Sequence, residues 1–391
     1  RLINLPLIVY WMIVADFRIM IKVAILLSRF DMTGMTTNAI DLFEGLRLCE
    51  GVSPVLMVGK PDNIEVVGSN RFYSKYLSDS DVVFYKSCVS SPFQVLKTTI
   101  RVIELLVQGR YDLVHCESPY YTYIPWLCGK KFLSTMHVTD IYPKLYFKRG
   151  SHCISISKET TRWAIDVCRF KPQQVTMVTH GVSTRFACPL DERERKGVMQ
   201  QYGIPRAKIY IGLVGSIEPR KGHDVLLRAI AGLPSEMRQQ IHILFVGSDK
   251  DEDQRSQRWL DGLVKETGLG NRITQIKYCD PYPLYKSMDI LVLPSRQEGF
   301  PLTAIEGMMS GTCVVRSNCE GADLQITDGV DGRLFKVDDV EGLRNILAEL
   351  INNTENRQTM ACAGQKKALQ EFSTERMAKD VYAVYKRLLS K

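Results

Sequence analysis

The sequence predicts an α/β protein built from two doubly wound domains. Its 391 residues are enough for about two domains of ordinary size. Short runs rich in valine and isoleucine alternate with helical stretches, which is typical of parallel sheets covered by helices. This alternation stops over the charged segment 188–208 and then begins again. We therefore expect a hinge at this segment, and a ligand site in the cleft between the two domains.

The expected strands form two groups, one on each side of the hinge. The first group is 21–28, 54–59, 81–85, 112–117, 131–137, 153–157 and 175–181. The second group is 208–216, 242–248, 272–278, 289–295, 312–317 and 333–337. From Met20 the sequence has a natural start that leads at once into the first expected strand, so residues 1–19 are expected to be an upstream extension or a non-native addition. Their apolar run is too short to cross a bilayer.

Composition restricts the class of protein and its partners. Apolar residues make up 45% of the chain and charged residues 24%, which is the balance of a folded soluble protein. The net charge of +8 is spread along the sequence, so it allows an acidic small molecule or an anionic membrane surface as partner and gives no sign of nucleic-acid binding. The 11 cysteines form no CxxC pair, which predicts reduced thiols and a cytoplasmic location.

The segment after the predicted strand 289–295 carries the strongest signal of a site. A loop holds Glu298, and a helix is expected to begin near Pro301. The unpaired amides from Phe300 to Thr303 would then form a helix start that binds phosphate. Glu306 follows in the second turn. Either glutamate alone would fit a role in complementing the helix dipole, but their spacing around two glycines and a proline favours a binding site.

A second group of polar residues follows the first strand of the second domain. This strand ends in Gly215 and Ser216, and the next loop brings Arg220 and Lys221. Two cations at the carboxyl end of a strand are placed to neutralise a diphosphate and to stabilise it as a leaving group. The alternative is an ordinary solvated basic turn. The position of this loop opposite the glutamate loop favours the site.

Several motifs together resemble a known family. They are EGFPLTAIE at 298–306, TMHVTD at 135–140, the loop containing RKG, and GADLQITDGVDGRLF at 321–335. From about Met20 onward, the chain resembles the retaining GT-B glycosyltransferases of family 4, a group that also contains lipopolysaccharide core glucosyltransferases and mannosyltransferases.

This resemblance implies an organisation for the whole chain. The expected GT-B fold has two Rossmann-like domains facing a central cleft. Residues 20–190 would bind the acceptor, and residues 191–372 would bind a nucleotide sugar. The last helix, 373–391, would pack back on the N-terminal domain.

The resemblance also implies roles for individual residues. In the second domain, Arg220 and Lys221 would bind the donor diphosphate, Glu298 the hydroxyls of the transferred sugar, and Glu306 the ribose. In the first domain, His137 would contact the sugar near its reacting carbon. A single histidine at a strand end is more often structural, but here the motif around it favours the contact with the sugar.

Gly34 and two acidic triplets complete the set of candidates. Gly34 would let the backbone approach the donor phosphate. The triplets, at 249–253 and 79–81, have the DxD pattern with which a different glycosyltransferase fold holds a metal ion. Because the two cations and the helix start already supply positive charge, we predict no catalytic metal and no cofactor.

The predicted function is the retaining transfer of a hexose from a nucleotide diphosphate sugar. UDP is the favoured nucleotide and GDP the second choice, with the base expected near 277–281. The acceptor is expected to be a glycan or a lipid-linked molecule in cell-surface polysaccharide or lipopolysaccharide synthesis. Two alternatives keep the same fold: a nucleotide-sugar sensor or silent partner subunit, and a nucleotide-sugar epimerase.

The first domain also carries many cations and aromatic residues, which suits peripheral contact with an anionic membrane. The alternative is a solvated basic face with its aromatic residues in the core. The residues concerned are Lys97, Arg101, Arg110, Lys130, Lys131, Lys144, Lys148, Arg149, Tyr120, Tyr121, Tyr123, Trp126, Tyr142, Tyr146 and Phe147.

Overall fold

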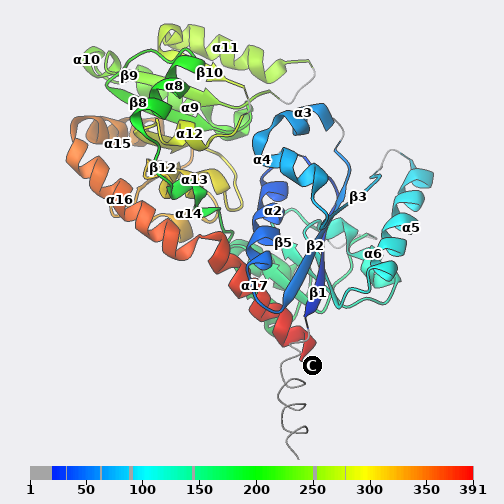
Figure 1. Ribbon diagram of the computed structural model, residues 1–391. Helices are drawn as coiled ribbons and strands as arrows, with labels where there is room; N and C mark the ends of the chain where they lie inside the picture. Colours follow the sequence, from blue (N-terminus) through cyan, green and yellow to red (C-terminus); the bar gives the residue numbers. More distant parts are fainter. Residues whose placement is uncertain are drawn as a thin grey trace, which may run out of the picture.

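The computed structural model describes residues 20–390, apart from 32, 62–63, 88–90, 143–145, 250–252 and 278. These residues fold into two α/β domains that face each other, and the last helices run from one domain to the other (Figure 1). The predicted fold class is confirmed, because each domain is built on its own parallel sheet. The predicted extension 1–19 lies outside the described residues.

The first domain contains a sheet of seven strands in the order β3-β2-β1-β4-β5-β6-β7. All its strand pairs are parallel, and the central strands are buried on both faces, which explains their continuous apolar sequence. The strands are β1 (Ile21–Leu27), β2 (Val52–Gly59), β3 (Val82–Tyr85), β4 (Leu113–Cys116), β5 (Phe132–Met136), β6 (His152–Ser155) and β7 (Val175–Met177).

The second domain repeats this plan with six strands in the order β10-β9-β8-β11-β12-β13. They are β8 (Ile209–Val214), β9 (Ile241–Val246), β10 (Ile273–Ile276), β11 (Ile290–Leu293), β12 (Cys313–Ser317) and β13 (Arg333–Phe335). The strand order reverses between β1 and β4 in the first sheet and between β8 and β11 in the second. Loops at the carboxyl ends of such strand pairs are where ligands bind in open α/β sheets.

Helices cover both sheets. Those of the first domain are α2 (Gly34–Arg47), α3 (Ile64–Ser69), α4 (Arg71–Ser74), α5 (Pro92–Gln108), α6 (Tyr123–Leu127) and α7 (Lys158–Asp166), with the 3-10 turns η1 (Lys75–Ser78), η2 (Pro119–Tyr121) and η3 (Pro172–Gln174). The hinge region contains η4 (Thr184–Ala187) and α8 (Glu192–Gln201). The second domain adds η5 (Pro219–Lys221), α9 (His223–Ala231), α10 (Ser235–Arg238), α11 (Arg255–Thr267), η6 (Gly270–Arg272), α12 (Tyr282–Tyr285), α13 (Leu302–Met309), α14 (Ala322–Gln325), α15 (Val340–Asn352) and α16 (Thr354–Glu371).

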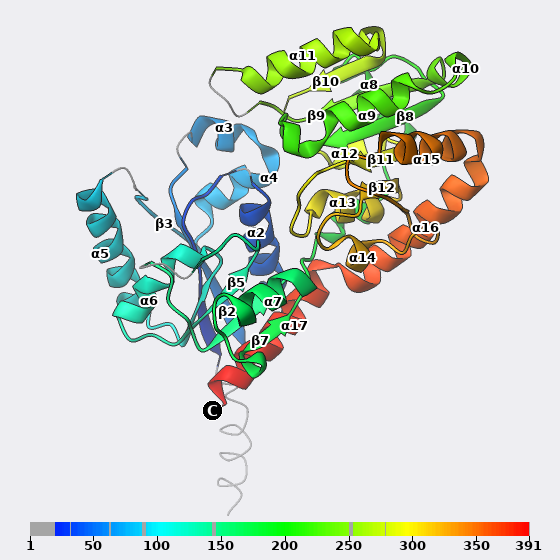
Figure 2. The ribbon, with the colours of Figure 1, turned by 180° about the vertical axis from the view of Figure 1, so that it is seen from behind.

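The final helix, α17 (Thr374–Leu389), leaves the second domain and lies along the first (Figures 1 and 2). It packs against α2 so closely that a Cβ added at Gly45 would lie 2.7 Å from the Cβ of Ala378. Met377, Val381 and Tyr385 are buried with the core of the first domain. The C-terminal helix is therefore part of the first domain's hydrophobic core.

Two further observations concern the surface and the cysteines. None of the helices in the described part of the chain has both the length and the apolar composition needed to cross a bilayer. The ten cysteines that the structure describes are all unpaired.

Candidate active site

The predicted cations and the first glutamate meet at the carboxyl edge of the second sheet. Lys221 Nζ donates a hydrogen bond to Glu298 Oε1 at 2.6 Å. Arg220 Nη1 lies 3.8 Å from the other oxygen of the same carboxylate. The loops that follow the neighbouring strands β8 and β11 thus form one cluster of charges, with the Lys221 and Glu298 side chains only 16% and 11% exposed.

A glycine allows these two loops to come together. Gly222 has a left-handed backbone with φ of 73°, and a Cβ at this position would lie 2.0 Å from the carbonyl oxygen of Pro294. A side chain would therefore push the loop of Arg220 away from the end of β11. A backbone hydrogen bond of 2.8 Å from Arg296 to the Arg220 carbonyl also joins the loops.

Glu218, which no sequence pattern predicted as part of the site, holds this loop in place. It accepts hydrogen bonds from Arg220 Nη2 at 2.8 Å and from Ser216 Oγ at 2.6 Å. Burial opposes ionisation of Glu218, but these hydrogen bonds and the charge of Arg220 outweigh it and lower its pKa. Ser216, just after Gly215, therefore contributes to the site by orienting a carboxylate.

The helix expected near Pro301 is α13, which begins at Leu302 with Pro301 as its N-cap. No side chain caps this helix, so its first amides are directed toward the loop that carries Glu298. Phe300 and Leu302 are buried beside it. The position suits an anion, as expected of an uncapped helix start next to two cations.

Glu306 lies deeper in the site than Glu298 does. Its side chain is buried, and the Tyr285 hydroxyl donates a hydrogen bond of 2.7 Å to Glu306 Oε2. Burial raises the pKa of Glu306 to about 7, although the hydrogen bond from Tyr285 and the charge of Arg185 act in the opposite direction. The carboxyl group therefore changes charge near neutral pH.

His137 brings the first domain into the site. It follows β5 directly and is buried. A Cβ added at Gly299 would lie only 2.5 Å from the backbone oxygen of His137, so the glutamate loop of one domain lies against the histidine of the other. The structure thus brings His137 next to the loop that carries Glu298.

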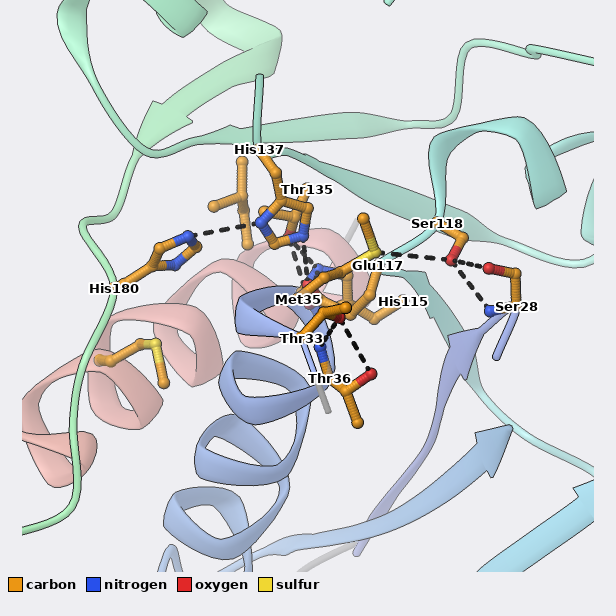
Figure 3. A network of polar contacts seen from close by, with 12 residues as sticks. Ser28, Thr33, Met35, Thr36, His115, Glu117, Ser118, Thr135, His137 and His180 are labelled. Atoms are coloured by element: carbon orange, nitrogen blue, oxygen red, sulfur yellow. Dashed lines mark hydrogen bonds and ion pairs between the residues drawn. The ribbon is translucent and has the colours of Figure 1, made fainter. Parts of the chain in front are cut away.

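Behind His137 lies a buried polar network that the sequence analysis missed (Figure 3). Glu117 Oε2 is 2.7 Å from His137 Nε2, and Glu117 Oε1 is 3.2 Å from His115 Nε2. On the other side, His137 Nδ1 lies 3.4 Å from His180 Nε2. Histidine and glutamate both appear at the end of the predicted strand 112–117, and this was the available signal.

Burial and the contacts among these side chains determine which of them are charged. Burial would raise the pKa of Glu117, but the rings of His115 and His137 outweigh this effect and lower it to about 2. Burial, together with the neighbouring His137, lowers the pKa of His180 to about 3. Glu117 is therefore an ionised carboxylate, and His180 is a neutral ring, at neutral pH.

The remaining predicted residues lie at the edges of the site or away from it. Gly34 is the first residue of α2, and a Cβ there would meet no atom within 4 Å, so its approach to a phosphate stays a prediction. Asp79 and Asp81 both pair with Arg47, at 2.6 and 2.7 Å. Asp249 accepts a hydrogen bond from the backbone of Gln257, whereas Asp251 lies outside the described residues.

Comparison with known proteins finds similarity to one family of enzymes. Residues 194–367 match the model of the glycosyl transferases group 1. A D-inositol 3-phosphate glycosyltransferase of Stackebrandtia nassauensis is 28% identical over 227 residues, which is 56% of this chain and 50% of the relative. The lipopolysaccharide core biosynthesis mannosyltransferase LpsB of Rhizobium meliloti is 27% identical over 219 residues, or 55% of this chain and 61% of the relative. These similarities support a group 1 glycosyltransferase.

A solved structure has the same fold as this chain. The crystal structure of Anabaena HepE in complex with UDP and glucose superimposes with a TM-score of 0.76 at 18% identity, covering 94% of this chain and 100% of that one. The sequence matches span about half of the first relative and three fifths of the second. The matched family segment contains the cations and both glutamates, whereas His137 and Glu117 precede it.

Proposed function

We propose that this group 1 glycosyltransferase transfers a hexose from a nucleotide diphosphate sugar, with retention of configuration, to a glycan or lipid-linked acceptor. The main support is that Lys221, Arg220, Glu298 and the start of α13 lie together at one edge of the second sheet. His137 of the first domain lies against the loop that carries Glu298. UDP is the favoured nucleotide, because HepE, which shares the fold, was crystallised with UDP and glucose. GDP is the second choice.

The charges of the site suit a diphosphate leaving group. In the free protein, Lys221 forms an ion pair with Glu298. A bound diphosphate would share the Lys221 charge, so Glu298 would become available to accept hydrogen bonds from the sugar hydroxyls. Arg220 and the amides at the start of α13 would add donors for the phosphate oxygens.

The proposed reaction needs no side-chain base. The bond from the sugar C1 to the diphosphate oxygen breaks, and a new bond forms from C1 to the acceptor oxygen on the same face. The acceptor proton passes to an oxygen of the departing diphosphate. Electrostatic stabilisation of that leaving group by Lys221 and Arg220 is then the main contribution of the protein.

A donor screen followed by product analysis tests the proposal. The parent enzyme is incubated with UDP-hexoses and GDP-hexoses, and release of the nucleotide is measured with and without acceptor extracts. Mass spectrometry then locates the added hexose, and NMR determines the anomeric configuration of the product. We expect an added hexose of the same anomeric configuration as in the donor, with Lys221→Ala inactive and the exposed-surface control Lys265→Ala unchanged.

Other outcomes would contradict this function in distinct ways. Tight nucleotide-sugar binding without release of nucleotide would favour a sensor or a silent partner. Conversion of one nucleotide sugar into another without an acceptor would favour an epimerase. An inverted product would contradict the retaining mechanism alone.

We further propose that the first domain docks on an anionic bilayer through α5. Phe93, Leu96, Ile100 and Val107 are between 48% and 63% exposed, and their spacing places them on one side of this helix. α5 lies at the outer edge of the first domain, away from the second (Figures 1 and 2). Such an apolar stripe suits insertion at a lipid interface.

Basic side chains lie on and near this apolar face of α5. Lys97 lies over the Phe93 ring at 4.5 Å from its centre. Beside the exposed Trp126, a surface cavity of about 700 Å³ is lined by four cations, Lys148, Arg149, Arg169 and Lys171. Of the aromatic residues that the sequence suggested for this surface, Tyr120, Trp126, Tyr142 and Tyr146 are exposed, whereas Phe147 is buried in the core.

Flotation with vesicles tests the docking surface. We expect recovery with anionic vesicles at low salt, a decrease at high salt, and a loss in Leu96→Ser combined with Ile100→Ser. The matched control is Leu369→Ser, which alters an exposed leucine of the second domain. Equal recovery with neutral and anionic vesicles, or no recovery with either, would contradict membrane docking.

A further inference from the structure

The buried carboxylate of Glu117 lies immediately behind His137. It follows β4 directly, its side chain is completely buried, and each of its oxygens faces a histidine ring. Burial of a charge is costly unless the group is fully paired. The pairing seen here therefore fixes where the hydrogens of the network lie.

The positions of the hydrogens on the histidine rings can be assigned in turn, starting from Tyr385 in the C-terminal helix. Tyr385 of α17 lies with its hydroxyl 2.6 Å from His115 Nδ1. Burial raises the pKa of Tyr385 well above its ordinary value, so the phenol keeps its proton. Since Glu117 Oε1 can only accept and lies 3.2 Å from His115 Nε2, the hydrogen of the His115 ring is on Nε2, and the Tyr385 hydroxyl donates a hydrogen bond to Nδ1. His115 Nε2 then carries the hydrogen of this neutral ring and directs it toward Thr135 Oγ1, at 2.6 Å, and Glu117 Oε1, at 3.2 Å.

The same reasoning sets the state of His137. An ionised carboxylate can only accept hydrogen bonds. Since Glu117 Oε2 lies 2.7 Å from His137 Nε2, this nitrogen must carry a hydrogen. The second nitrogen, Nδ1, faces His180, and at 3.4 Å this is a long contact for a hydrogen bond.

The Nδ1 side of His137 faces His180, which contacts the loop between Glu298 and α13. Figure 3 shows His137 between Glu117 and His180. The His180 ring in turn packs edge-on against Phe300, with ring centres 5.9 Å apart. Phe300 belongs to the loop between Glu298 and α13.

We propose that Glu117 is a positioning residue that fixes the Nε2–H form and the orientation of His137, so that Nδ1 can accept a hydrogen bond from a hydroxyl of the donor sugar in place of its long contact with His180. The inference rests on the proposed function, because it assigns His137 to the sugar. It adds the residue that holds the histidine and the nitrogen that makes the contact. A purely structural Glu117 would affect stability and leave both the histidine tautomer and the turnover of folded enzyme unchanged.

Nitrogen NMR on the free wild-type chain tests the assignment directly. The chain has six histidines, so selective labelling of histidine with ¹⁵N gives a spectrum in which His137 is assigned by its absence in His137→Asn. We expect the Nε2–H tautomer for His137 when the ring is neutral. A dominant Nδ1–H tautomer in the wild type would overturn the proposal, even if no variant of Glu117 folds.

Kinetics of Glu117→Gln test the consequence. This variant keeps the size of the side chain but presents an amide whose NH₂ group competes for His137 Nε2. We expect kcat to fall about tenfold to a hundredfold, as for other residues that orient a histidine, while the Kd for UDP stays within about twofold, because the diphosphate is held in the second domain. The ¹⁵N spectrum of this variant should show a changed tautomer mixture at His137.

The matched control is Tyr385→Phe, which removes a hydrogen bond from the same network at His115. We expect its kcat to stay within about twofold of the parent. A loss of kcat in Glu117→Gln no larger than in this control, or an unchanged His137 spectrum, would overturn the proposal. If the parent transfers no hexose, the proposed function fails, and with it the contact between Nδ1 and the sugar, while the wild-type spectrum still decides the position of the proton.

Discussion

The two halves of the candidate site are built in different ways. In the second domain, Arg220, Lys221 and Glu298 lie on two loops at the ends of adjacent strands, and their side chains are partly open to solvent. In the first domain, Glu117 and His115 are fully buried, and their partners come from β5 and from α17 at the far end of the chain. In the second domain, the charged groups are accessible to a ligand. In the first domain, the buried groups hold one side chain, that of His137. Substitutions in the two regions should therefore have different effects.

The largest effect is expected at Lys221. Because its charge should matter most as the diphosphate departs, Lys221→Ala should reduce kcat by about a hundredfold or more. Steady-state kinetics with the preferred donor measure this change, with Lys265→Ala as control. If the variant kept an activity within a few fold of the parent, Lys221 would not be part of the site. The expected difference in effect between substitutions in the two domains would then not hold.

A pH effect on stability is expected from Glu306. Its folded-state pKa of about 7 lies above its ordinary value of 4.5. The folded protein thus binds this proton more tightly than the unfolded chain, so stability falls as the pH rises from about 4.5 through 7, by about 3 kcal/mol in total. Urea unfolding at several pH values should show this loss in the parent and not in Glu306→Gln. Parallel pH profiles for the two proteins would contradict it.

Binding of the nucleotide gives the next largest effect. At pH 8, where Glu306 is ionised, Glu306→Ala should weaken binding of the nucleotide diphosphate by about 1.5 to 3 kcal/mol, because hydrogen bonds to a charged acceptor are lost. Calorimetry measures the difference. An unchanged affinity would place the ribose elsewhere.

In the first domain, we expect a change in stability with little change in activity. Tyr385→Phe removes the hydroxyl that bonds to His115 and should lower the free energy of unfolding by about 1 kcal/mol. Denaturant unfolding monitors this loss. A fall in kcat of tenfold or more in folded Tyr385→Phe would show that the buried network as a whole, and not only Glu117, controls the reaction.

The smallest effect is expected from chelation. If Arg220, Lys221 and the start of α13 supply the positive charge for a diphosphate, as proposed, EDTA should leave the parent activity within about twofold. Strict dependence on manganese would instead return attention to the acidic loop that contains Asp249 and Asp253.

The sequence by itself determined the fold class and the part of the candidate site that lies in the second domain. Both sheets follow from apolar strands that recur along the chain, and the residues from Glu298 to Glu306 lie within one strand–loop–helix unit, so their relation depends on local geometry. The tertiary structure alone decided the environment of His137. Glu117, His180 and Tyr385 are spread over more than 260 positions of the chain, and only the tertiary structure, including the crossing of α17 and the pairing of β4 with β5, brings them into one buried network. Burial, which no local pattern records, then sets the charge of Glu117 and the raised pKa of Glu306.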